Sequence, residues 1–234
     1  MAKKARKAGR QSFLITNGHA RSRVAEAYRT LRTNMGFTEM DHPCRTVMIT
    51  SSHMVEGKST TASNLAIVMA QAGNHVLLVD CDLRKPLQHR LFNISNQVGF
   101  TSCLRQRALL DEAFHPGPVE HLTILPSGPL PPNPSELLAS EQCKRIWADL
   151  KARYDYVFID TPPVLLVADA AILAAQVDGV LLVVDSGRTR IDHAQQSKEQ
   201  LTKANAHIIG VVLNKVKTED DKQYYYYSED VSSN

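Results

Sequence analysis

The sequence predicts an α/β protein in which helices cover both faces of a mostly parallel sheet. Several short runs, such as 156–159 and 208–213, are apolar throughout instead of alternating with polar residues. Continuous apolar runs separated by helical segments are typical of parallel strands that are buried on both faces. A chain of 234 residues can bury one substantial core, so we expect a single globular domain with tails.

The composition is that of an ordinary soluble chain, with 43% hydrophobic and 22% charged residues. No apolar run reaches the roughly 18–20 residues of a membrane span, and the basic start lacks the apolar stretch of a secretory signal. The four cysteines are scattered without Cys-x-x-Cys spacing. We therefore expect free thiols in a reducing cytoplasm rather than a disulfide framework or a zinc site.

Charge divides the chain into three parts. Residues 1–10 carry five Lys or Arg and no acid, whereas 217–230 carry five Asp or Glu against two Lys. We expect a basic flexible arm over 1–20, a globular domain over 21–216 and a disordered tail over 217–234. A basic arm can contact anionic lipid or nucleic acid. A solvated terminus is commoner, however, and we expect no nucleic-acid partner.

The first predicted element is an amphipathic helix over residues 21–37. Its apolar stripe consists of Val24, Tyr28, Leu31 and Met35. A different face carries Glu26, Arg29 and Arg32, spaced three apart. This face is either solvated, with a weak Glu26–Arg29 pair, or a charged interface with a neighbouring subunit. The side-chain physics alone favours the solvated face.

A strand over 44–50, a short loop and a helix over 58–73 form the next unit. The loop ends in Gly57-Lys58-Ser59-Thr60 and opens directly into the helix, which is the setting of a phosphate-binding loop. Backbone N–H groups and the positive end of the helix dipole converge there on an anion. Lys58 is expected to reach nucleotide phosphates, and the Ser59 hydroxyl to bind Mg²⁺.

The loop departs from the full Gly-x-x-x-x-Gly-Lys-Ser/Thr pattern. Ser52 stands where the pattern has glycine, and Val55 lies where backbone approaches phosphate closely. A β-branched residue resists positive φ. Either the loop holds Val55 at negative φ with its side chain turned outward, or phosphate binding is impaired. We expect Val55→Gly to tighten nucleotide binding.

The rest of the chain continues the alternation of strands and helices. Further strands are predicted over 75–79, 122–125, 156–159, 180–184 and 208–213. Helices are expected from 135 to 150, from Asp169 onward and over 189–204. Residues 87–115 are predicted to form short helices and loops, and the five prolines of 126–134 mark a turn-rich connector.

Three acidic side chains fall at the carboxyl ends of predicted strands: Asp80, Asp82 and Asp160. Ligands of parallel α/β sheets sit beyond this edge, and carboxylate oxygens suit Mg²⁺. Each acid alone is more often a helix cap or loop residue, but with Lys58 and Ser59 they form a candidate site. Asp80 and Asp82 lie two apart, so one can bind metal while the other takes a proton from an attacking hydroxyl.

These motifs resemble those of the bacterial tyrosine kinases (BY-kinases) of the CpsD/CapB type. The segments similar to the family's Walker A, Walker A′ and Walker B motifs are 56–66, 79–86 and 158–163. The Pro-rich stretch 127–138 and the Glu26-x-x-Arg29-x-x-Arg32 spacing, a subunit contact in the family, also match. The family's autophosphorylated tail is matched by Tyr224, Tyr225, Tyr226 and Tyr227. The resemblance covers nearly the whole chain.

The resemblance implies a P-loop fold of the deviant Walker group, like that of MinD and ParA, and an ATP-dependent protein-tyrosine autokinase. The implied ATP contacts are Glu56, Gly57, Lys58, Ser59, Thr60 and, at adenine, Asn214. The implied Mg²⁺ ligands are Ser59, Asp82 and Asp160. Asp80 would be the base for the tyrosine hydroxyl, acting with Lys58 and Asp82 in catalysis.

The resemblance also implies partners and a location. Subunits would form a ring through Glu26, Arg29 and Arg32, and each tail would enter a neighbour's site. The cytoplasmic segment of a transmembrane polysaccharide co-polymerase would activate the kinase and hold it, as a peripheral cytoplasmic protein, at the inner face of the membrane. A protein-tyrosine phosphatase would reverse the reaction, other proteins would be substrates, and the process served would be capsule or exopolysaccharide synthesis and export.

Two other functions fit the same residues. ATP-switched dimers of the MinD/ParA type usually carry a second lysine early in the loop, where this chain has His53. Their membrane-binding members end in a basic amphipathic helix, whereas this chain ends in acids and tyrosines. A nucleotide-binding regulator with weakened catalysis is the other alternative, and Val55 is its main support.

Overall fold

A seven-stranded sheet forms the centre of the computed structural model, which describes residues 14–15, 22–38 and 44–216. The strands are β1 (Thr46–Ser51), β2 (Val76–Asp80), β3 (His115–Pro116), β4 (Leu122–Leu125), β5 (Tyr156–Asp160), β6 (Gly179–Asp185) and β7 (Ile208–Asn214). Their order is β3-β4-β2-β5-β1-β6-β7, and every neighbouring pair except β3–β4 is parallel. The predicted parallel sheet is confirmed. β3 was not predicted, because two residues give no apolar run.

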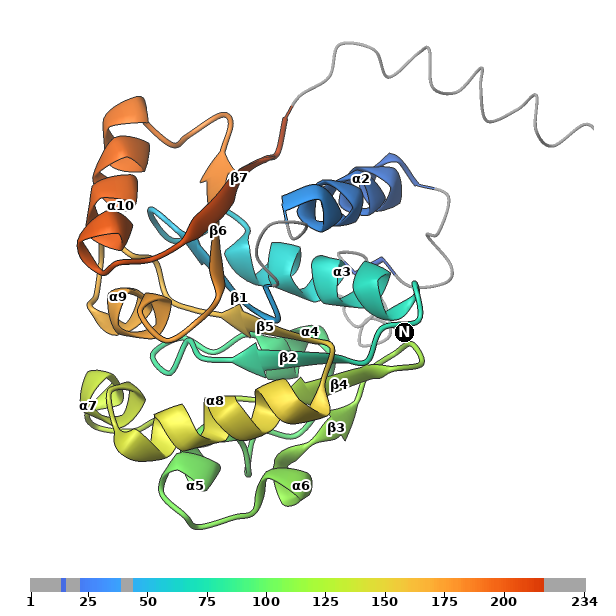
Figure 1. The fold of residues 1–234 in the computed structure, drawn as a ribbon, viewed down its shortest axis with the longest axis vertical. Helices are drawn as coiled ribbons and strands as arrows, with labels where there is room; N and C mark the ends of the chain where they lie inside the picture. The colour runs from blue at the N-terminus through green and yellow to red at the C-terminus, as the bar shows by residue number, and fades with distance from the viewer. Residues whose placement is uncertain (1–13, 16–21, 39–43, 217–234) are drawn as a thin grey trace, which may run out of the picture.

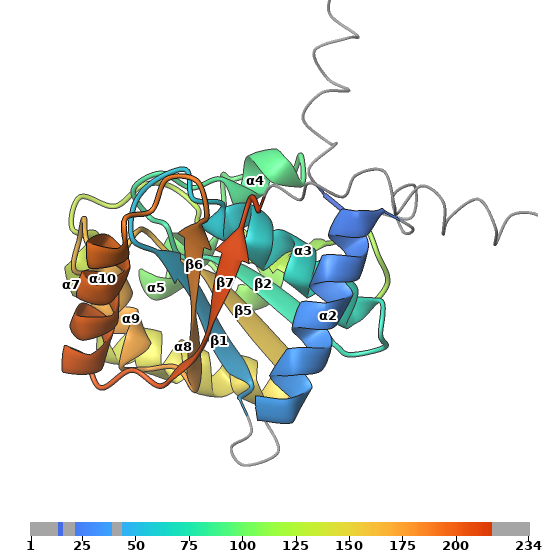
Figure 2. The same cartoon turned by 90° about the horizontal axis from the view of Figure 1, so that it is seen from above.

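Helices cover both faces of this sheet, as predicted (Figure 1). One face carries α2 (Arg23–Thr38) and α3 (Lys58–Ala70), and the other carries α8 (Glu141–Arg153), α9 (Asp169–Ala174) and α10 (Ile191–Lys203), which Figure 2 shows on opposite sides of the strands. The short helices are α4 (Gln88–Leu91), α5 (Phe100–Leu104), α6 (Leu110–Ala113) and α7 (Pro134–Leu138). The first three, α4, α5 and α6, confirm the expectation of short helices and loops over 87–115.

The core consists of two layers that the sheet separates. Along β2, Leu77 and Val79 pack into the layer under α8 and α9, whereas Val76 and Leu78 pack into the layer under α3. All five residues of this strand are buried. This two-sided burial explains why the strands read as continuous apolar runs.

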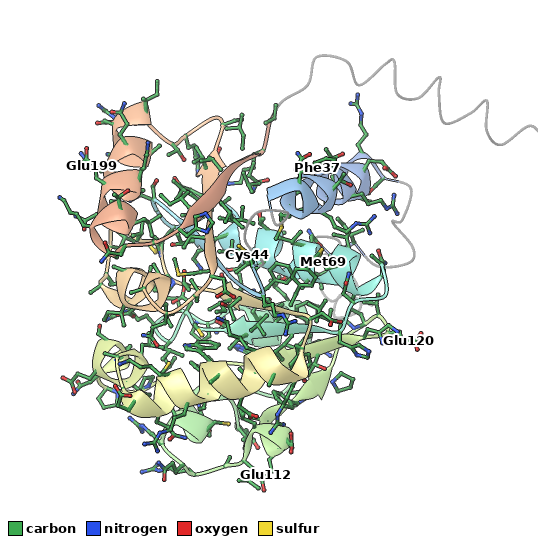
Figure 3. All side chains as sticks on the ribbon, viewed as in Figure 1. Phe37, Cys44, Met69, Glu112, Glu120 and Glu199 are labelled. Atoms are coloured by element: carbon green, nitrogen blue, oxygen red, sulfur yellow. The ribbon has the colours of Figure 1, made fainter. Side chains whose placement is uncertain are left out.

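The apolar stripe of α2 differs from the prediction at its first residue. Val24 is 55% exposed, whereas Ala25 is fully buried and Met35 is buried. Tyr28 and Leu31 are partly buried against the layer under α3. The buried stripe therefore starts one residue later, where a small side chain lets the two helices approach closely. Phe37, labelled on α2 in Figure 3, is 68% exposed.

The single helix predicted over 135–150 is in fact two helices, α7 and α8. Ser140 lies between them in an extended conformation, with φ −69° and ψ 152°, and its side chain accepts a hydrogen bond from the Cys143 backbone N–H. This is an N-cap, which starts a new helix instead of continuing the old one. The helix predicted over 58–73 likewise ends earlier, at Ala70.

As predicted, the four cysteines form no disulfide bond, and all of them are buried: Cys44, Cys81, Cys103 and Cys143. Among the residues that the structure describes, none of the helices has both the length and the apolar character that crossing a membrane requires. Of the predicted arm over 1–20, the structure describes residues 14–15 alone, and the predicted tail 217–234 lies outside the described residues.

Candidate active site

Three adjacent strands bring the predicted site residues to one edge of the sheet. β2, β5 and β1 are neighbours, and their carboxyl ends carry Asp80, Asp160 and the phosphate loop respectively. Asp80 and Asp160 are direct partners in the parallel register of β2 and β5. The structure therefore places both acids beside the loop, at the edge where the sequence analysis expected them.

Lys58 is the first residue of α3 and connects the loop to the acids. Its Nζ lies 3.0 Å from Asp82 Oδ2, 3.5 Å from Asp160 Oδ1 and 3.1 Å from Ser59 Oγ. Burial opposes its charge, but the carboxylates of Asp160 and Asp82 outweigh burial and raise the pKa of Lys58. The ammonium group is thus charged, and it neutralises two carboxylates that a Mg²⁺ ion could also bind.

Asp80 is fully buried, and its carboxylate is held by the chain that follows it. Its Oδ1 accepts the backbone N–H of Asp82 at 3.2 Å, and its Oδ2 accepts those of Leu87 and Gln88 at 3.0 and 2.9 Å. Burial and the nearby Asp160 raise the pKa of Asp80 to about 8. The side chain has no exposed surface in this structure.

Asp82 and Asp160 are differently placed. Asp82 lines the cleft in front of the loop, and its Oδ1 accepts the backbone N–H of Lys85 at 3.0 Å. Asp160 lies deeper and is fully buried. Burial raises the pKa of Asp160, and the adjacent Lys58 ammonium opposes this rise. Both carboxylates contact the same lysine, so they are close enough to share one cation.

Gln88 is a central residue that the sequence analysis did not identify. Its Nε2 donates to Asp160 Oδ2 at 2.8 Å and to the Ser59 carbonyl at 3.1 Å, and its Oε1 accepts the Ser63 hydroxyl at 2.7 Å. Gln88 is fully buried and connects the start of α4 to β5 and α3. A lone glutamine in this segment forms part of no recognisable motif, so only the fold reveals its role.

The two unusual loop residues are accommodated in different ways. Ser52 is buried, and its hydroxyl accepts a hydrogen bond from Ser197 of α10 at 2.8 Å. Val55 has φ 68° and is 74% exposed. Of the two alternatives that the sequence left open, the one with negative φ is not observed, although the side chain is turned outward as that alternative expected. A β-branched residue in this left-handed region costs roughly 1–3 kcal/mol, so the surrounding structure must hold it there.

Glu56, Gly57 and Asn214, which the resemblance assigned to ATP, contact one another. Asn214 Nδ2 donates to the Glu56 carbonyl at 2.9 Å. A Cβ on Gly57, which has φ 101°, would lie only 2.0 Å from that Asn214 nitrogen. The Glu56 carboxylate accepts the His53 backbone N–H at 3.0 Å and the Thr189 hydroxyl at 2.5 Å. These contacts hold the loop against the ends of β6 and β7.

The loop forms one wall of a cleft with a volume of about 1070 Å³, somewhat above the roughly 300–1,000 Å³ of common small-molecule sites. Gly57, Lys58, Ser59, Thr60 and Asp82 line its phosphate end. The opposite walls come from three segments, and their lining residues are Lys85, Pro86, Leu87, His89, Arg90, Gly128, Pro129, Leu130, Pro162, Pro163, Leu166 and Val167. Two of its apolar residues, Leu130 and Leu166, are 59% and 47% exposed. The cleft therefore combines a phosphate-type end with an exposed apolar shelf.

The predicted subunit-contact residues lie on α2, away from this cleft. Arg29 pairs with Glu26 within the helix, and Arg32 Nη1 donates to the Val68 carbonyl of α3 at 3.1 Å. This intrahelical pair is the one expected if the charged face of the helix is exposed to solvent. The four tail residues Tyr224 to Tyr227 lie outside the described residues.

Comparisons with known proteins agree with this geometry. A family model described as an AAA domain matches residues 44–209. The tyrosine-protein kinase YwqD of Bacillus subtilis is 44% identical over 217 residues, which cover 93% of this chain and 92% of YwqD. The crystal structure of the chimerical protein CapA2B2 superposes with a TM-score of 0.85 at 38% identity, covering 88% of this chain and 91% of that one.

A more distant structural neighbour shares the fold alone. The septum site-determining protein MinD of Pyrococcus horikoshii, solved in complex with Mg-ADP, superposes with a TM-score of 0.63 at 23% identity. The match covers 79% of this chain and 76% of MinD. The predicted P-loop architecture of the MinD type is therefore confirmed.

Proposed function

The chain belongs to the family of bacterial tyrosine-protein kinases, and we propose that it phosphorylates its own C-terminal tyrosines, Tyr224 to Tyr227, in trans with Mg²⁺-ATP. The observation that carries the proposal is the cluster of Lys58, Ser59, Asp82 and Asp160 at the phosphate end of the cleft. It combines one ammonium, one hydroxyl and two carboxylates, as a bound nucleotide and its metal require.

The donor set fits Mg²⁺. Ser59 Oγ and the carboxylates of Asp82 and Asp160 are hard oxygen ligands gathered around Lys58 Nζ, and few protein ligands suffice because Mg²⁺ keeps water and phosphate oxygens. When bound, Mg²⁺ would offset phosphate charge in the transition state. Lys58 would then exchange its carboxylate partners for phosphate oxygens, with Glu56, Gly57 and Thr60 around the phosphates and Asn214 near adenine. MinD, which shares this fold, was solved with Mg-ADP.

The chemical step proposed is an in-line transfer. The tyrosine oxygen forms a bond to the γ-phosphorus while the bond from that phosphorus to the β–γ bridging oxygen breaks, which releases ADP. The phenol proton passes to a carboxylate. Asp80 is the proposed acceptor because it ends β2 beside Asp160 and lies two residues from Asp82, as the resemblance to the bacterial tyrosine kinases implies. Asp82 is the alternative acceptor, since it lines the cleft whereas Asp80 is covered by backbone N–H donors.

The tyrosines of a second copy would reach the site within a homo-oligomeric ring. The support for α2 as a contact surface is its exposed face, where the Glu26–Arg29 pair lies on a helix that also exposes Val24 and Phe37. In a subunit contact the Arg29 fork would exchange its intrahelical partner for a carboxylate of the neighbour. Arg32, which holds α3 in the single chain, would keep the helix in place.

The wider role proposed is control of capsule or exopolysaccharide synthesis and export. We propose activation by the cytoplasmic segment of a transmembrane polysaccharide co-polymerase, reversal by a protein-tyrosine phosphatase, and additional protein substrates. The enzyme would act in the cytoplasm, at the inner face of the membrane, through that partner. The likeness to relatives named as tyrosine-protein kinases supports this role.

Phosphosite mapping after incubation with Mg²⁺-ATP separates the three candidate functions. Phosphotyrosine on residues 224–227 that is lost in Lys58→Met supports the kinase. ATP hydrolysis without phosphotyrosine supports a MinD/ParA-like switch, and neither product supports a regulator. The assay is run with and without the activator's cytoplasmic segment, because a kinase that depends on its partner forms no phosphotyrosine alone.

A further inference from the structure

A second lysine contacts the phosphate loop from the far end of the chain. Lys215, the first residue after β7, has φ 57°, and its Nζ lies 2.5 Å from the Val55 carbonyl and 2.7 Å from Asp185 Oδ2. Asp185 ends β6, is 3% exposed and also accepts the Gly187 backbone N–H at 3.0 Å. The lysine thus connects a buried carboxylate to the tip of the loop.

Lys215 contacts the loop at Val55, a β-branched residue with a positive φ. Val55 is in the left-handed region, and its side chain is 74% exposed. The peptide after Val55 is fixed from outside, by Lys215 on the Val55 carbonyl and by Asn214 on the Glu56 carbonyl. Both donors lie at the end of β7, where Asn214 is the register partner of Asp185 on β6.

We propose that Lys215 is a positioning residue for the nucleotide: it fixes the Val55 carbonyl so that a loop with valine at this place keeps the shape that binds phosphate. The proposal rests on the nucleotide binding proposed above. Turning two successive carbonyls toward β7 orients the intervening peptide, and this orientation determines where the neighbouring N–H groups point. The same hydrogen bond from Lys215 lowers the pKa of Asp185.

A lysine in this place has a second possible role, direct contact with a phosphate. The geometry favours positioning, because the Lys215 ammonium already contacts a carbonyl and a buried carboxylate. The two roles predict different results when the strain at Val55 is removed. A positioning lysine becomes dispensable once glycine occupies position 55, whereas a phosphate ligand does not.

The test is a double-mutant cycle on full-length, phosphatase-treated protein, with the Kd of Mg²⁺-ADP measured by calorimetry. We expect Lys215→Met to raise the Kd about tenfold, as the loss of roughly one charge-assisted contact does. In the Val55→Gly background the same change should raise the Kd no more than about twofold. Lys215→Arg should retain most of the affinity, and Lys198→Met, at an exposed lysine of α10, is the matched control with no effect.

If Lys215→Met weakens Mg²⁺-ADP binding equally in both backgrounds, Lys215 binds the nucleotide directly. If it weakens binding in neither background, the contact with Val55 does not affect nucleotide binding. Both results overturn the proposal. A companion measurement separates this failure from failure of nucleotide binding itself. Hydrogen exchange of residues 52–58 in the nucleotide-free protein should accelerate in Lys215→Met and not in Lys198→Met. Unchanged exchange would overturn the proposal that Lys215 fixes the Val55 carbonyl, even if Mg²⁺-ADP does not bind.

Discussion

Val55 occupies a backbone conformation that disfavours its residue type. Glycine at this position would remove a strain of roughly 1–3 kcal/mol but would add about 0.5–1 kcal/mol of backbone entropy cost on folding. We expect Val55→Gly to raise the free energy of unfolding by about 1 kcal/mol, measured by urea denaturation. A lower stability would mean that the loop does not hold Val55 at positive φ.

Gln88 makes four hydrogen bonds within the buried network of Asp80, Asp160, Ser59 and Ser63. Its side chain makes three of these bonds, and Gln88→Leu would remove the donor to Asp160 Oδ2, at about 1–3 kcal/mol for a buried polar group. The Ser63 hydroxyl and the Ser59 carbonyl would keep their own hydrogen bond of 2.8 Å. We expect the variant to lose about 1–3 kcal/mol of unfolding free energy in urea denaturation.

Gln97→Leu serves as the control for Gln88→Leu. Gln97 is an exposed glutamine whose backbone N–H, not its side chain, donates to the Ser95 hydroxyl at 3.3 Å. Its replacement should therefore change stability by less than about 0.5 kcal/mol. Equal stability of Gln88→Leu and wild type would contradict the network described above.

At the scale of elements, a carboxylate joins the start of β1 to α8. Asp178 Oδ2 accepts the backbone N–H and the hydroxyl of Thr46, both at 2.9 Å, and its Oδ1 accepts Lys151 Nζ at 2.6 Å. Partial burial opposes the charge, but these bonds outweigh burial and lower the pKa of Asp178 below its usual 3.8. The carboxylate therefore stabilises the fold when it is ionised.

Asp178→Asn tests this contribution and its pH dependence. A carboxyl group with a lowered folded-state pKa stabilises the protein above its ordinary pKa, and the stability is lost as the pH falls through that range. We expect the variant to lose about 1–3 kcal/mol of unfolding free energy near neutral pH, with the difference from wild type shrinking below about pH 4. A difference that stays constant on acidification would contradict the assignment.

The elements were predicted to different degrees. Long apolar runs identified β1, β2, β4, β5, β6 and β7, because burial on both faces leaves a clear pattern. The break between α7 and α8 was missed because Ser140 acts as a cap through a local hydrogen bond, which the helical periodicity on either side conceals. Val24 was assigned to the core because periodicity predicts how far apart the buried residues of a helix lie. It does not predict which residue the buried stripe starts on, because that depends on the element against which the helix packs.

At the scale of the whole molecule, the strand order decides which residues meet. Lys58, Asp82 and Asp160 could be grouped from the sequence, since parallel strands end at a common edge. The contacts of Gln88 and Lys215 could not, because they depend on which strand ends lie beside the loop. Residue Lys215 follows Asn214 on the sheet's edge strand, and no spacing in the sequence connects it with Val55.

The proposed ring gives a prediction that separates folding from assembly. The Glu26–Arg29 pair is exposed, and pairs of this kind contribute about 0–1 kcal/mol to stability. We expect Arg29→Ala to change the free energy of unfolding by less than about 0.5 kcal/mol while reducing the oligomer mass measured by light scattering. Arg23→Ala on the same helix is the comparison variant. An unchanged mass would remove α2 from the interface.

The most direct test of the central claim mixes two full-length variants with Mg²⁺-ATP and the activator's cytoplasmic segment. One carries phenylalanine at all four tail tyrosines and keeps Lys58; the other is Lys58→Met with its tyrosines intact. We predict phosphotyrosine on residues 224–227 of the Lys58→Met chain in the mixture and none when either variant is incubated alone. No phosphotyrosine in the mixture, under conditions in which the wild type phosphorylates itself, would contradict phosphorylation in trans by this cleft.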